Sequence, residues 1–116
     1  MFGGLGDVNP FNTWTYDGTN WTMQAPSTQP PLVYASSTVF DPNLNTVILF
    51  GGGSGGVDQS STWAWPGSDW KQVVPTQSPG AREGAGIAYD VALGHVILFG
   101  GQNHEVPMND TWELTP

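Results

Sequence analysis

The feature that most constrains this chain is an internal repeat of about 49 residues. Two motifs return at a spacing of 48 or 49 residues: Phe-Gly-Gly at 2–4, 50–52 and 99–101, and Thr-Trp at 13–14, 62–63 and 111–112. Residues 30–67 align with residues 79–116 without a gap. A fixed period of this length is typical of repeat architectures, in which each unit buries its apolar faces against its neighbours.

Each unit is predicted to contain four short strands, a to d. The 16 Gly and 10 Pro among 116 residues favour short strands joined by turns over helices. Run lengths and turn residues place strand a at 36–40 and 85–89, strand b at 46–50 and 95–99, strand c at 13–16, 62–65 and 111–114, and strand d around Trp21 and Trp70. The sequence therefore predicts an all-β fold of antiparallel four-stranded meanders.

The residues of strands a and b indicate how these sheets pack. Strand b is apolar at successive positions, as in Val47-Ile48-Leu49-Phe50, which is the pattern of a strand covered on both faces. Strand a begins with small residues, Ala35-Ser36-Ser37 and Gly84-Ala85-Gly86, as expected where backbones crowd together. Sheets that radiate from a crowded centre, each covered by its neighbours, form a β-propeller.

The repeat resembles the kelch repeat, especially the bacterial type found in galactose-oxidase-like propellers. The resemblance rests on an apolar strand ending in Phe-Gly-Gly, then Thr-Trp, then Gly-x-x-Trp as in Gly18-Thr19-Asn20-Trp21, and a Pro-rich link to the next unit. It implies four-stranded blades on a rigid platform that bears loops. The family's Pro-x-x-Arg signature is present in Pro79-Gly80-Ala81-Arg82, whereas Val33 replaces the arginine in the preceding copy.

The chain is predicted to be a single kelch-repeat domain, 1–116. It comprises a partial blade at 1–25, a full blade at 26–74 and a partial blade at 75–116. Closed propellers use roughly four to eight blades, so about 2.4 repeats cannot close a ring. We therefore expect either a fragment of a longer protein or a ring completed by a cyclic homo-oligomer, with a trimer slightly preferred. Such a ring sets strands c and d of the first blade beside strands a and b of another chain, in competition with the strand at 111–114.

Five residues are candidates for ligand binding. In a meander the b–c loops (5–12, 53–61 and 102–110) share one face with the link 74–83. Loops on a rigid scaffold commonly carry binding sites. The candidates on this face are Asp58, Arg82, Glu83, His104 and Glu105. The alternative is structural: Arg82 pairs with a nearby acid or carbonyl, and the others are solvated.

Composition excludes several partners and chemistries. Lys71 and Arg82 are the only cations against ten acids, and a net charge of −8 opposes binding to nucleic acid or to an anionic membrane. The chain has no Cys, so disulfides, thiolate catalysis and the Tyr–Cys copper chemistry of galactose oxidase are impossible. Adjacent His104 and Glu105 lack a third ligand at usable spacing, so we expect neither metal nor cofactor.

The absence of an apolar run of about 18 residues and of a signal peptide predicts a soluble chain whose compartment stays open. The six Trp occupy repeat positions, so we expect them to pack between blades rather than to bind sugar.

Two function classes remain. The kelch resemblance and the incomplete catalytic constellations favour a non-enzymatic binding or scaffold module that self-assembles into a propeller, with protein or carbohydrate as possible ligands. The alternative is a fragment of a carbohydrate-active or oxidase-type propeller enzyme with its site at the ring mouth. A glycosidase needs two carboxylates at a fixed separation, which Glu83 with Asp58 or Glu105 could supply.

Overall fold

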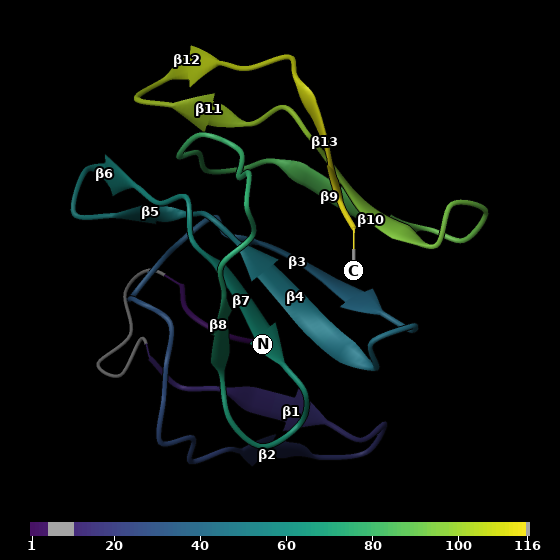
Figure 1. Cartoon of the computed structure of the whole chain (residues 1–116). Coiled ribbons are helices and arrows are strands. Elements are labelled where there is room, and N and C mark those ends of the chain that lie inside the picture. Colours follow the sequence, from purple (N-terminus) through teal and green to yellow (C-terminus); the bar gives the residue numbers. More distant parts are fainter. Residues whose placement is uncertain (5–10, 116) are drawn as a thin grey trace.

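The computed structural model describes residues 1–4 and 11–115, and across them it has thirteen strands and no helix (Figure 1). The predicted all-β fold with antiparallel sheets is confirmed. Since these residues form no helix, none in the described part is long and apolar enough to cross a membrane.

The strands form two larger sheets and three hairpins. A four-stranded sheet in the order β3-β4-β7-β8 consists of Ser37–Asp41, Thr46–Phe50, Thr62–Trp65 and Lys71–Val73. A three-stranded sheet in the order β13-β10-β9 consists of β9 (Gly86–Asp90), β10 (His95–Phe99) and β13 (Thr111–Leu114). The hairpins are β1–β2 (Trp14–Tyr16, Trp21–Met23), β5–β6 (Gly53–Ser54, Val57–Asp58) and β11–β12 (Gln102–Asn103, Val106–Pro107).

The two larger sheets have the same register at a distance of 49 residues. Val47 pairs with Trp65 as Val96 pairs with Leu114, and Ser37 pairs with Phe50 as Gly86 pairs with Phe99. The predicted bounds of strand b hold in both copies, whereas strand a begins and ends one residue later than predicted. That these sheets are kelch blades stays a prediction.

An Asx turn joins the first two strands of each sheet. The carboxylate of Asp41 accepts hydrogen bonds from the backbone N–H groups of Asn43 and Leu44, at 2.9 and 3.1 Å. The carboxylate of Asp90 accepts from the equivalent N–H groups, at 2.8 and 3.0 Å. A short carboxylate that captures the N–H groups two and three residues ahead fixes the tight reversal, which explains why Asp stands at this position in both copies.

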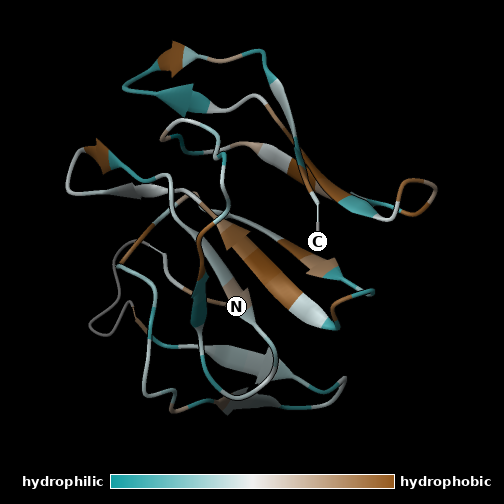
Figure 2. Ribbon diagram, viewed as in Figure 1, coloured by the Kyte–Doolittle hydropathy of each residue, from teal (hydrophilic) through white to brown (hydrophobic). Residues whose placement is uncertain are grey.

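The core lies around the four-stranded sheet. Leu49, Trp63, Trp65 and Trp70 form a buried cluster against which Phe2 packs, and β4 is the most continuously apolar strand (Figure 2). These three Trp are therefore buried in packing contacts, as expected. Trp21 is 55% exposed within the single chain, and its packing against a neighbouring blade stays a prediction. Trp21 lines an open groove between the β1–β2 hairpin and the four-stranded sheet.

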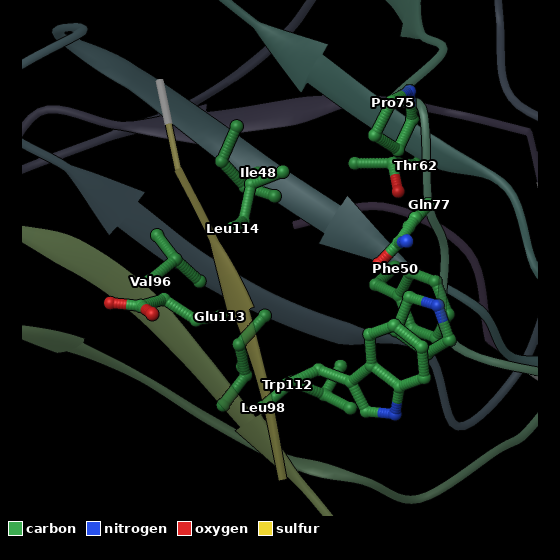
Figure 3. Close-up of a pocket in the computed structure, with 12 residues that line it drawn as sticks. Ile48, Phe50, Thr62, Pro75, Gln77, Val96, Leu98, Trp112, Glu113 and Leu114 are labelled. Carbon is green, nitrogen blue, oxygen red and sulfur yellow. The ribbon is translucent and has the colours of Figure 1, made fainter.

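The two larger sheets meet along their first strands. The Ser37 hydroxyl donates to the Ala85 carbonyl at 2.6 Å, and the Gly84 N–H donates to the Ala35 carbonyl at 2.8 Å. This close approach is what the small residues of strand a predict. Between the sheets lies an apolar cavity of about 40 Å³ that Phe50 and Trp112 both line (Figure 3). Roughly 10–15 Å³ of such volume holds one water molecule, so the cavity has room for a few waters and is too small for a ligand of more than a few atoms.

Candidate functional site

The predicted loop face is built from two hairpins that the sequence did not predict. The segments after β4 and β10 fold into β5–β6 and β11–β12, which lie at the same end of the molecule (Figure 1). Of the predicted loop 5–12, residues 5–10 lie outside the described residues. The Gly55 and Gly56 turn of β5–β6 has φ of 58° and 81°, values that glycine adopts without strain, which explains the glycine run. Candidate residues therefore stand on paired strands and tight turns.

Asp58 and His104 tie the two hairpins together. The Asp58 carboxylate accepts a hydrogen bond from the backbone N–H of His104 at 2.9 Å. His104 and Glu105 form the turn of the second hairpin with positive φ of 47° and 65°. Both side chains are exposed, so these two residues present an imidazole and a carboxylate to solvent from a fixed turn.

Arg82 is buried and its hydrogen-bonding groups are largely used inside the protein. It is 1% exposed, and its guanidinium donates to both oxygens of Asp110 at 2.7 and 2.8 Å. Nη1 also donates to the Gly100 carbonyl and Nε to the Gly80 carbonyl, both at 3.0 Å. This is the structural alternative stated above, and it places Asp110 rather than the guanidinium at the surface.

Asp110 is a site residue that the sequence reasoning missed. The Arg82 guanidinium, and after it the Trp112 indole N–H at 2.6 Å, hold the pKa of Asp110 far below its usual range. The signal lay in the repeat. In the other copy, Ser61 stands at the position of Asp110 and accepts from the Trp63 indole N–H at 3.2 Å. In that copy Val33 stands at the position of Arg82. The two positions change together within one chain.

Glu83 lies between the β5–β6 and β11–β12 hairpins. Its backbone forms an antiparallel bridge with Gln102, and its Oε1 accepts from the Gln102 Nε2 at 3.0 Å. Its Oε2 is buried without a hydrogen-bond partner. A Cβ placed on Gly53 would come within 2.6 Å of this oxygen, so the absence of a side chain there makes room for the carboxylate.

The structure thus brings Asp58 to the backbone of His104 and Glu83 to the side of Gln102, and it withdraws Arg82 from the surface. In the described part of the chain, no three His, Asp or Glu side chains gather as a metal site would need. Asp58, His104 and Glu105 lie on the two hairpins at one end of the molecule, and the role of the five predicted residues in binding a ligand stays a prediction.

Comparison with models of protein families and with curated proteins finds no match for this chain.

Proposed function

We propose that this chain is a non-enzymatic binding or scaffold module built from kelch-type repeats, and that its copies assemble into a propeller. The observation that carries the proposal is a contact between successive units that recurs. The Gly52 N–H donates to the Arg82 carbonyl at 2.9 Å, and the Gly4 N–H, one repeat earlier, donates to the Val33 carbonyl at 3.3 Å. A relation between neighbours that repeats along one chain can be continued by a further copy.

Exposed apolar side chains support assembly. Tyr16 and Trp21 are each 55% exposed on the β1–β2 hairpin, and Phe99 is 55% exposed at the end of β10. Their repeat equivalents Trp70 and Phe50 are 4% exposed. Since contiguous apolar surface of this kind marks an interaction site, the exposed members are the surfaces we assign to contact between chains.

The hairpin end is the surface we assign to a protein or carbohydrate ligand. The β5–β6 and β11–β12 hairpins present Asp58, His104 and Glu105, with Asp110 beside them in the chain and 41% exposed. Because Asp58 holds the second hairpin and Glu83 holds Gln102, both carboxylates serve structure, which favours a scaffold over a catalytic pair.

Light scattering coupled to size exclusion tests the assembly. A single chain has a mass of 12.4 kDa, and we expect a defined multiple of it, with three chains preferred. The net charge of −8 per chain opposes contact, and salt screens it over about 8 Å at 0.15 M, so moderate salt should increase the multimer fraction. A folded monomer whose mass is independent of protein and salt concentration would refute the proposal.

A further inference from the structure

An aromatic groove separates the β1–β2 hairpin from the four-stranded sheet. It has a volume of about 500 Å³, and its aromatic walls are Phe2, Trp14, Tyr16, Trp21, Trp65 and Trp70. The rings of Tyr16 and Trp21 lie 5.1 Å apart and are both half exposed. An open groove lined by exposed aromatic rings is a candidate interaction surface.

The strand edge beside this groove is open. β1 pairs along one edge with β2. On its other edge the described residues contribute the bridge between Thr13 and Phe2 and two hydrogen bonds between Met1 and the Trp14 backbone, at 2.7 and 2.9 Å, and no strand pairs there with Thr15 or Tyr16. The equivalent strands β7 and β13 each carry a five-residue strand on that edge, namely β4 and β10. The groove therefore lies where the other two units have their first two strands.

Trp70 shows what normally covers a tryptophan at this repeat position. Its ring lies 5.3 Å from that of Phe2, and its indole N–H donates to the Thr13 hydroxyl at 2.9 Å. Trp21 stands 49 residues earlier and has no such cover in the described structure. By analogy with Trp70, the cover of Trp21 would be a Phe and a Thr from a preceding unit, and the chain contains that pair again as Phe50 and Thr62.

We propose that the β1–β2 hairpin of one copy docks on the edge of β10 in a second copy, in place of β13. This deepens the proposed function and rests on the self-association stated there. The register follows from the β10–β13 pairing by a shift of 98 residues. It sets Thr13 opposite Phe99, Trp14 opposite Leu98, Thr15 opposite Ile97, and Tyr16 opposite Val96.

The hairpin offers more to β10 than β13 does. β13 supplies one strand, and its Trp112 lines a cavity that Phe50 and Thr62, both buried, also line. The hairpin supplies the same strand with Trp14 in place of Trp112, together with a second strand that carries Trp21. In the docked state Trp21 covers Phe50 and Thr62 of the second copy, as Trp70 covers their equivalents within one chain.

Charge also permits the exchange. Glu113, which pairs with His95 across β13 and β10, is replaced in the docked register by Thr15. The edge therefore gains no new like charge, and Glu113 moves off the β10 edge while the net charge of each chain stays at −8. The segment around Phe2 and strand β13 are the parts released in each copy.

A cysteine pair tests the register, because the chain has no cysteine of its own. Facing residues of antiparallel strands have Cα atoms about 4.5–5.5 Å apart, within disulfide reach. The variant T15C/I97C should form covalent multimers on oxidation. The matched control is T22C/I97C, since Thr22 is the β2 partner of Thr15 and lies one strand further from β10. That control should stay uncrosslinked, because a second strand spacing of about 4.8 Å takes it out of reach.

A second variant blocks the exchange. Ile97 pairs with Glu113 inside the chain, so oxidised I97C/E113C fixes β13 on β10. Light scattering should show this variant as a 12.4 kDa monomer when oxidised and as the wild-type multimer after reduction. Circular dichroism of the reduced forms controls for folding, and reduced I97C/E113C must match wild type.

The outcomes separate the two proposals. A wild-type multimer with no T15C/I97C crosslink, and with oxidised I97C/E113C still multimeric, overturns this interface and leaves the proposed function standing. A wild type that is monomeric at every concentration overturns both.

Discussion

The Arg82–Asp110 pair offers the sharpest test of how the segments of one unit are held together, because the other copy of the repeat contains its own substitute. There Val33 and Ser61 occupy the two positions, and Val33 is 2% exposed. The variant R82V/D110S therefore gives this copy of the repeat the residues that the other copy has at the same two positions. If the pair acts as a unit, the loss of stability in the double variant should be smaller than the sum of the losses in the two single variants.

The magnitudes follow from the partners of Arg82. R82V deprives the buried Gly100 carbonyl of its donor, which costs about 1–3 kcal/mol, whereas the exposed Gly80 carbonyl can turn to water. The freed Asp110 carboxylate is 41% exposed, so it is hydrated and keeps its bond from Trp112. D110S instead leaves the Arg82 guanidinium, whose side chain has no exposed surface, without its carboxylate partner. It should therefore destabilise the protein more than R82V does.

Urea unfolding followed by tryptophan fluorescence and circular dichroism measures the four free energies of the double-mutant cycle. The effect of D110S should shrink strongly when Val already stands at position 82, giving a coupling of about 1–3 kcal/mol. If the two single losses of stability simply add, or if D110S is at least as stable as R82V, the ion pair does not hold the segments around Arg82 and Asp110 together.

Acid should weaken the fold. Folding lowers the pKa of Asp110, which lies beside Arg82, and the pKa of Asp69, which accepts from the Ser27 hydroxyl. The stability that these carboxylates contribute is complete above the unfolded pKa near 3.9. It is lost as the pH falls through the folded pKa values. The urea midpoint should be flat from about pH 5 to 7 and fall below about pH 4; a rise on acidification would contradict this. Gly51→Ala should destabilise more than Gly55→Ala, since both have similar positive φ but only the Gly51 Cβ would meet a backbone carbonyl, at 2.4 Å; equal melting temperatures would refute the contact. On a broad glycoside panel, wild type and Glu83→Gln should both lack turnover, and pH-dependent hydrolysis lost in the variant would instead support the enzyme alternative.

The sequence predicts strands b and c well because a marker bounds each of them. An apolar run that stops at Gly-Gly defines strand b, and Thr-Trp opens strand c, so β4, β7, β10 and β13 have the predicted bounds. Strand a lacks such a marker. Ala35 and Gly84, which stand just before it in the two copies, have positive φ of 51° and 65°, so regular strand geometry begins later than the small residues suggest.

The site is harder to predict because its contacts join residues that are far apart in the sequence. No local motif indicates that Arg82 turns inward to an acid 28 residues later in the chain. The short hairpins were missed for a related reason: strands of two residues, such as Gly53–Ser54, carry too little apolar pattern to stand out from a loop. The paired change of Arg82 with Asp110, to Val33 with Ser61, was the one readable signal.

Two ties bear on the binding that we propose for the hairpin end, and the one between Asp58 and His104 crosses the unit boundary. The Asp58 carboxylate holds the neighbouring hairpin through the His104 N–H, and Glu83 holds Gln102 by both backbone and side chain. A ligand that meets two hairpins already fixed to one another orders little chain on binding, and such preorganisation favours affinity. Because these ties hold the hairpins that carry His104 and Glu105, changing Asp58 or Glu83 should shift the affinity for the proposed ligand even where neither residue touches it.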